Sequence, residues 1–159
     1  MIHNFYGNSM EVILASATAV GSAQLFKFLW YRLRGKAVNF KILVQTGGMP
    51  SSHSACMMAM ATSVGLIEGF ESTIYAVALG ISFIVMYDAA GLRRTAGHMA
   101  GILNKISEDI YSEKPEHIPE RLRELLGHTP VEVLVGAFLG AGMAYAYHVR
   151  LAAATIGLS

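Results

Sequence analysis

Four apolar segments alternate with more polar ones along the chain. They cover residues 10–31, 52–67, 72–92 and 131–149. An α-helix rises about 1.5 Å per residue, so about 20 residues cross the hydrocarbon layer of a membrane. Segment 52–67 is short for a perpendicular span and predicts a broken or partly buried helix. The pattern predicts an all-α, membrane-embedded helical bundle of about four spans, formed by residues 1–159 as a single domain.

The segments between the predicted helices differ in character. Residues 32–46 carry four basic side chains and no acid, which is typical of a loop on one membrane face. Residues 68–71 contain a glycine between two acids and predict a tight turn. Residues 105–127 mix acids with bases and contain Pro115 and Pro119, which break helices. We therefore expect a solvated loop with short amphipathic helices in that region.

Composition strengthens the membrane interpretation. The 159 residues are 53% apolar and 14% charged, whereas a soluble domain of average composition is about a quarter charged. The single cysteine, Cys56, excludes an internal disulfide. Gly136 and Gly140 have the spacing that lets two membrane helices bring their backbones together. These features indicate an integral membrane protein whose helices pack closely.

Basic residues are distributed unequally between the two faces of the predicted bundle. Of the twelve Lys and Arg, five lie in residues 27–41, six lie in residues 93–123, and the last is Arg150. With four spans, the two basic segments lie on the same face, which the positive-inside rule places in the cytoplasm. We therefore expect both termini on the non-cytoplasmic side of a bacterial cytoplasmic membrane or of an organelle membrane.

The start of the second predicted helix has features of an anion site. Ser51 and Ser52 are good N-cap residues, and they place His53 in the first helical turn. A helix start presents unpaired N–H groups and the positive end of the helix dipole, which suit a phosphate. Taken alone, this stretch also fits an ordinary helix cap with a surface histidine.

A second histidine stands at the start of the last predicted helix. His128 is followed by Thr129 and Glu132, which form a Thr-x-x-Glu capping box. If the two basic loops lie on one side of the membrane, both histidines face the same aqueous layer. Two histidines, two helix starts and nearby cations then predict a phosphate site.

These stretches together resemble the type 2 phosphatidic acid phosphatase superfamily, which includes the vanadium-dependent haloperoxidases. The resemblance is to its divergent branch in bacteria and plants, and it covers residues 24–140. The motifs are Gly-Gly-Met-Pro-Ser-Ser-His-Ser (47–54), Val-Met-Tyr-Asp-Ala-Ala-Gly-Leu-Arg-Arg (85–94) and Leu-Gly-His-Thr-Pro-Val-Glu-Val (126–133). Lys27 and Arg34 match the spacing of the Lys and Arg in the first motif of the superfamily.

The resemblance implies a metal-independent phosphatase or pyrophosphatase that acts on a lipid phosphate and needs no cofactor. His128 would form a phosphohistidine, Glu132 would orient it, and His53 would exchange the proton with the leaving group and water. The residues implied to hold the phosphate oxygens are Lys27, Arg34, Ser51, Ser52 and Arg123.

Several residues admit a second interpretation. Lys27 also fits a lysine that snorkels to the membrane surface, and Glu132 also fits a plain capping role, which is compatible with orienting a histidine. An acid near the end of a span is usually paired, so Asp88 is expected to pair with Arg93 or Arg94. That pair either binds phosphate or anchors the helix end, and we keep its members among the phosphate-binding candidates.

The motifs depart from those of the superfamily at three positions. Ser52 replaces a glycine, Glu132 replaces an aspartate, and Gly35 stands where a proline follows the arginine. Arg123 aligns with the arginine before the nucleophile only if one residue is deleted. The alternative function is therefore a catalytically degenerate membrane scaffold that binds or moves lipid phosphates or partner proteins. Nucleic acid is not an expected partner, and homo-oligomerisation is left open.

Overall fold

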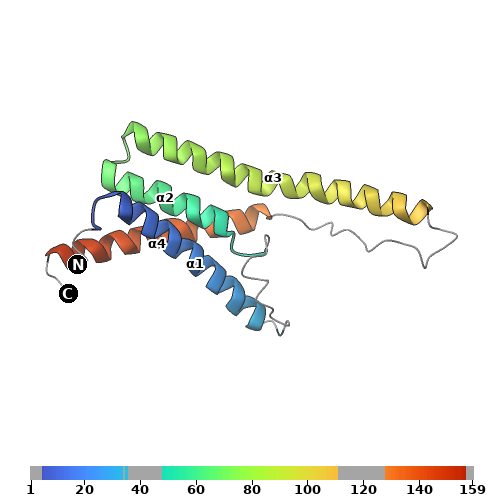
Figure 1. Cartoon of the computed structure of the whole chain (residues 1–159), viewed down its shortest axis with the longest axis horizontal. Helices are drawn as coiled ribbons and strands as arrows, with labels where there is room; N and C mark the ends of the chain where they lie inside the picture. Colours follow the sequence, from blue (N-terminus) through green and yellow to red (C-terminus); the bar gives the residue numbers. More distant parts are fainter. Residues whose placement is uncertain (1–4, 34, 36–47, 111–127, 157–159) are drawn as a thin grey trace.

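The fold is an all-α helical bundle (Figure 1). The computed structural model describes residues 5–33, 35, 48–110 and 128–156. Within these ranges it contains no strand, and its helices are α1 (Ser9–Leu33), α2 (Ser52–Glu68), α3 (Thr73–Ile110) and α4 (Pro130–Ile156). Three segments are long and apolar enough to cross a membrane, namely α1, the Thr73–Gly91 part of α3 and nearly all of α4. The predicted membrane helical bundle is thereby confirmed. The described residues contain three such segments where about four spans were expected, because α2, with 17 residues, is too short.

The short helix α2 is the centre of the bundle. It packs against each of the other three helices, whereas α3 makes few contacts with α4. α2 has 17 residues, and its fully buried positions are all small: Ser54, Ala55, Ala59, Ala61, Ser63 and Gly65. Small side chains let neighbouring helices approach α2 closely. The prediction of a short, partly buried helix is therefore confirmed.

Two glycines of α4 allow that close approach. A Cβ atom added to Gly136 would collide with the backbone carbonyl of Ser51, and one added to Gly140 would collide with that of Ala55. Both contacts are with backbone atoms, which cannot turn away as a side chain can. The expected backbone contact through the Gly136–Gly140 pair is confirmed, and it seats the start of α4 on the start of α2.

α1 contributes one continuous buried stripe. At every fourth residue it places Ala15, Ala19 and Ala23, which are fully buried and pack against alanines of α2 and α4. Glu11 and Lys27 continue the same stripe at its two ends and are 0% and 2% exposed. Sixteen residues of helix separate them by about 24 Å. The bundle therefore buries one charged side chain of α1 toward each end.

The Glu11 end of the stripe forms a polar cluster that the sequence patterns did not indicate. Glu11 Oε1 lies 2.6 Å from His148 Nδ1 on α4, and Glu11 Oε2 accepts a 2.7 Å hydrogen bond from the backbone N–H of Gly7. The ring of Tyr6 lies 5.1 Å from that of His148, centroid to centroid. These contacts tie the first turn of α1 to the last turns of α4.

The third predicted segment was expected to end at Leu92 and to give way to a loop from Lys105. The span itself is confirmed, since the apolar part of α3 ends at Gly91. The start of the loop is wrong, because α3 runs without interruption to Ile110 and its second half extends beyond the other helices (Figure 1). The stretch contains no proline, and an isolated glycine such as Gly91 weakens a helix without ending it. The turn at residues 68–71 is confirmed, with Gly69 at φ +89°.

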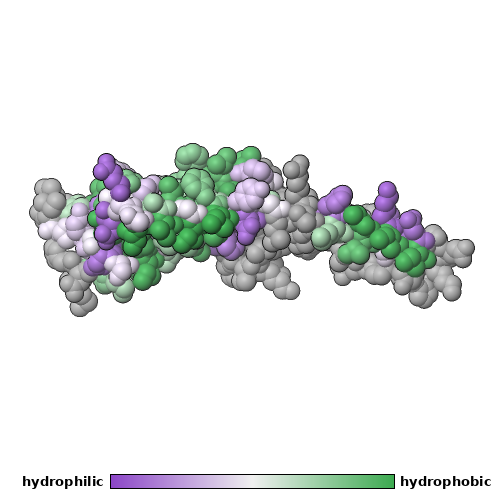
Figure 2. Space-filling model, turned by 90° about the horizontal axis from the view of Figure 1, so that it is seen from above, coloured by the Kyte–Doolittle hydropathy of each residue, from purple (hydrophilic) through white to green (hydrophobic). Residues whose placement is uncertain are grey.

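The surface of the bundle is largely apolar, as a membrane-spanning protein requires. Figure 2 shows apolar side chains over much of one face of the bundle, and an apolar band beside polar side chains on the α3 extension. The exposed apolar residues of that extension are Met99, Ile102, Leu103, Ile106 and Ile110. Most of the basic loop at residues 32–46, and residues 111–127, lie outside the described ranges.

Candidate phosphate site

The starts of α2 and α4 come together as the two motifs predict. The backbone N–H of Ser51 donates to the carbonyl of Glu132 at 3.0 Å, and the N–H of His128 donates to the carbonyl of Ala89 on α3 at 3.2 Å. These bonds bring the rings of His53 and His128 to a centroid distance of 6.3 Å, edge to face. Two histidines 75 positions apart in the sequence thus share one end of the bundle.

Ser51 is the N-cap of α2. Its backbone is extended, with φ −72° and ψ 116°, and its hydroxyl oxygen accepts hydrogen bonds from the backbone N–H of Ser54 at 3.3 Å and from the hydroxyl of Ser54 at 3.0 Å. Ser51 is fully buried. This cap fixes the entry of α2, so His53 lies in the first turn as expected, and its side chain is exposed.

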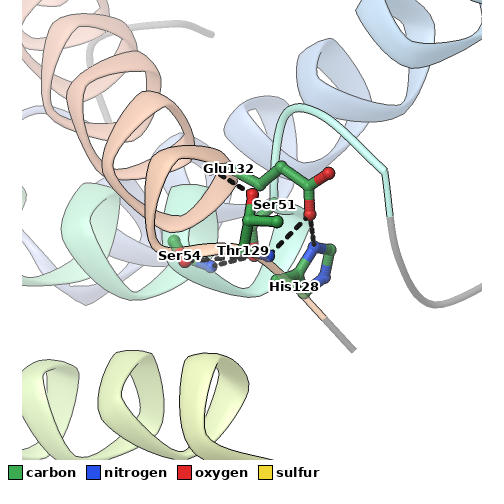
Figure 3. A network of polar contacts seen from close by, with 5 residues as sticks. All are labelled: Ser51, Ser54, His128, Thr129 and Glu132. Atoms are coloured by element: carbon green, nitrogen blue, oxygen red, sulfur yellow. Dashed lines mark hydrogen bonds and ion pairs between the residues drawn. The ribbon is translucent and has the colours of Figure 1, made fainter. Parts of the chain in front are cut away.

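The capping box at the start of α4 is formed in full (Figure 3). The backbone N–H of Glu132 donates to Thr129 Oγ1 at 3.2 Å, and the backbone N–H of Thr129 donates to Glu132 Oε2 at 2.9 Å. The same Oε2 lies 3.4 Å from His128 Nδ1. This separation exceeds a usual hydrogen bond, so the contact is electrostatic, and it is an ion pair only when His128 is protonated. Glu132 therefore caps its helix and faces the histidine at once.

His128 is 4% exposed, and its surroundings alter its proton affinity. Burial lowers the pKa of His128, because the imidazolium loses hydration. Glu132 opposes this effect with its negative charge, while Lys27 and His53 lower the pKa further. The lowered pKa favours the neutral imidazole, which is the nucleophilic form.

Lys27 is buried in the bundle beside the candidate site. Its side chain is 2% exposed and acts electrostatically on His128 and Glu132. The chain before α2 passes close over it, because a Cβ added to Gly48 would lie 3.3 Å from Tyr31 Oη and 3.9 Å from Lys27 Cδ. This burial does not fit a lysine that snorkels to the membrane surface, and it places a buried cation beside the two helix starts.

Sequence reasoning missed one residue, Gln24. Its side-chain Nε2 donates a 3.3 Å hydrogen bond to Ser52 Oγ, which connects α1 to the first residue of α2. Gln24 stands three positions before Lys27, so both lie on neighbouring parts of one helix face. A polar residue one turn from a candidate phosphate ligand, inside an apolar span, was the signal that could have identified it.

The structure describes only some of the remaining candidate site residues. Asp88 lies on α3 beside Ala89, and its side chain is exposed. Arg34 and Arg123 lie outside the described residues, and the side chains of Arg93 and Arg94 lie outside the described part of α3. Whether Asp88 pairs with an arginine stays a prediction.

The described side chains offer two acid–base groups and one buried cation. His128 turns Nδ1 toward Glu132, which leaves Nε2 as the nitrogen able to attack an electrophile. His53 is a second imidazole on the neighbouring helix start, and Lys27 supplies positive charge. Within the described ranges, no group of three His, Cys, Asp or Glu side chains could hold a metal ion.

Comparisons with known proteins agree with the motifs. The family described as the Divergent PAP2 family matches residues 8–143. An uncharacterised membrane protein of Bacillus subtilis, YuiD, is 35% identical over 138 residues, which are 80% of this chain and 87% of that protein. No solved structure matches the chain significantly. Since the family match and the relative each span most of the chain, from α1 into α4, this protein belongs to the Divergent PAP2 family.

Proposed function

We propose that this protein is a membrane-embedded, metal-independent phosphatase or pyrophosphatase that acts on a lipid phosphate. The observation that carries the proposal is the pairing of His53 with His128 at the joined starts of α2 and α4, beside the buried Lys27. Helix starts and a buried cation attract an anion, and a neutral histidine held by a carboxylate is a suitable nucleophile.

In the first step, His128 Nε2 attacks phosphorus, and the bond from phosphorus to the leaving oxygen breaks. His53 donates its proton to that oxygen as the alcohol or phosphate departs. Glu132 stabilises the positive charge that develops on the ring of His128. Lys27, Ser51 and Ser52 belong to the set that would hold the equatorial oxygens of the phosphoryl group. The product of this step is a phosphohistidine.

In the second step, water attacks the phosphohistidine. His53, now neutral, takes a proton from the water, and the bond between His128 Nε2 and phosphorus breaks. Phosphate leaves and both histidines return to their initial states. Dividing the hydrolysis into two displacements lowers each barrier, because a positioned nucleophile replaces free water in the first.

The position of the site favours a lipid substrate. His128 lies just before the membrane-spanning part of α4, and Ala89, which binds its N–H, lies near the end of the Thr73–Gly91 segment. A phosphate at this level would be at the depth of lipid headgroups, with its chains in the bilayer. A headgroup phosphate can therefore reach the site without leaving the membrane.

Phosphate release from purified protein tests the proposal. Lipid monophosphates and diphosphates in mixed micelles, with a chelator present, should yield phosphate with wild type and none with His128→Ala. The variant must show the wild-type helix content and elution volume. Vanadate binding without any phosphate release would instead support the alternative, a scaffold that binds lipid phosphates without turnover.

We further propose that the site opens to the cytoplasmic side and that both termini lie on the other side. Support comes from the eleven Lys and Arg in residues 27–41 and 93–123, against Arg150 alone elsewhere. In a Cys56→Ala background, a membrane-impermeant thiol reagent applied to intact cells should label Ser159→Cys and spare Gly35→Cys. Labelling of Gly35→Cys alone would reverse the orientation, and labelling of both would overturn the number of spans.

A further inference from the structure

Gln24 joins α1 to the candidate phosphate site through one hydrogen bond, from its Nε2 to Ser52 Oγ at 3.3 Å. We propose that Gln24 is a positioning residue, which fixes the hydroxyl of Ser52 so that its proton is donated to a bound phosphate. The inference rests on the proposed function, because it concerns how the same site holds its anion.

The direction of this hydrogen bond carries the argument. A serine hydroxyl has one proton to donate and two lone pairs that accept, whereas an amide nitrogen only donates. With Gln24 Nε2 directed at Ser52 Oγ, one lone pair is occupied and the proton of Ser52 is free for another acceptor. Phosphate oxygens are strong acceptors, and Ser52 directly precedes His53 at the open start of α2.

The amide oxygen of Gln24 argues for a small net contribution of this side chain to the stability of the fold. Its Oε1 is buried and accepts no hydrogen bond within the described part of the chain. The net gain from one hydrogen bond to a neutral group is smaller than, or similar to, the loss from an unsatisfied buried oxygen. A methionine of similar length, without polar atoms, should therefore keep the stability or raise it.

A buried polar group that lacks a hydrogen-bond partner and does not stabilise the fold is expected mainly at functional sites. Ser63, on the same helix as Ser52, provides the comparison. Its hydroxyl is also buried without a partner, but it lies eleven residues, or about 16 Å, further along α2. Ser63 has the same kind of unsatisfied buried oxygen as Gln24, so what distinguishes Gln24 is its hydrogen bond to Ser52 beside His53.

Binding of orthovanadate to the purified full-length chain in detergent tests the proposal, with the thermal unfolding midpoint measured on the same samples. Gln24→Met should weaken vanadate binding by about tenfold to a hundredfold, the equivalent of one hydrogen bond to a charged group. Its unfolding midpoint should equal that of the wild type or exceed it. Ser63→Ala should keep wild-type affinity.

Two further variants separate positioning from direct contact. If Gln24 acts through Ser52, the double variant Gln24→Met/Ser52→Ala should bind vanadate as Ser52→Ala does alone. Gln24→Glu should bind more weakly than Gln24→Met, because a carboxylate would accept the Ser52 proton and repel the anion.

Wild-type affinity in Gln24→Met, additive losses in the double variant, or failure of Gln24→Met to fold would each overturn the positioning role and leave the proposed function standing. Absence of vanadate binding by the wild type would overturn both.

Discussion

Glu132 Oε2 lies 3.4 Å from His128 Nδ1 while it accepts the backbone N–H of Thr129 at 2.9 Å. The same carboxylate oxygen therefore caps the start of α4 and contacts the ring of His128. The two roles can be separated, because a glutamine still fits a capping box but carries no charge. This contact links the local sequence signal of a helix start to the proposed chemistry.

Glu132→Gln should lower the rate of phosphate release by orders of magnitude with little loss of stability, because the charge that stabilises the imidazolium is gone. Thr129→Ala should lower the stability and leave the rate of phosphate release nearly normal. It removes the oxygen that caps α4, at about 1 kcal/mol of stability, and leaves Glu132 beside His128. Thermal unfolding and phosphate release, measured on both variants, check the pair. A normal rate in Glu132→Gln would limit that residue to capping.

The close approach of α4 to α2 predicts opposite effects of adding a methyl group to different glycines. Gly136→Ala and Gly140→Ala should each destabilise the protein by about 1–3 kcal/mol, because the new Cβ meets backbone. Gly142→Ala, on the same helix, meets nothing within 4 Å and should stabilise it by about 0.5–1 kcal/mol. Unfolding in detergent checks the three variants, and equal effects would rule out a specific backbone contact.

His128 should titrate below the ordinary histidine pKa of about 6.5, because burial disfavours its charged form. Glu132→Gln should lower the pKa of His128 further, and Lys27→Met should raise it, since these charges act in opposite directions. NMR titration of the imidazole in micelles measures all three values.

The lowered pKa of His128 makes the stability of the protein depend on pH. The unfolded chain binds this proton more tightly than the folded protein, so the contribution of His128 to stability should be lost as pH falls below about 6.5 and through its folded pKa. A pKa at or above the ordinary value would contradict the electrostatic description of the site.

The cluster at the other end of the bundle should stabilise the fold without affecting the site. Glu11→Ala removes the buried carboxylate that contacts His148 Nδ1 and accepts the Gly7 N–H, and a hydrogen bond to a charged group contributes about 1.5–3 kcal/mol. Glu68→Ala is the control, because Glu68 is exposed at the end of α2 and its loss should change stability by less than about 0.5 kcal/mol. Chemical unfolding gives both values, and a loss of vanadate affinity in Glu11→Ala would show that the two ends are coupled.

Structural features that depend on a few neighbouring residues were predictable from the sequence. The N-cap at Ser51, the capping box of Thr129 with Glu132, and the Gly136–Gly140 pair each depend on residues within one helical turn or one short motif. The structure contains all three. The meeting of His53 with His128 was expected from two such starts on the condition that both lie on one membrane face.

Features that depend on packing between distant segments were not predictable. His148 and Glu11 are 137 positions apart, and no spacing rule connects them. From the sequence alone, Lys27 fits a snorkelling lysine. Its burial depends on α2 and on the chain near Gly48, which are distant in the sequence. The loop expected from Lys105 was placed too early, because a charged stretch without proline carries no stop signal. A role for Gln24 could be inferred only from its contact with Ser52.

The central claim is that phosphate passes through His128. The most direct test is to mix purified protein with a phosphate monoester labelled with ³²P, quench in alkali, where phosphohistidine is stable, and locate the label by peptide mapping. We expect label on His128 in the wild type and none in His128→Ala. In His53→Ala the label on His128 should both form and decay more slowly, because His53 is the acid of the first step and the base of the second. Turnover without label on His128, or equal labelling of His128→Ala, would contradict the central claim.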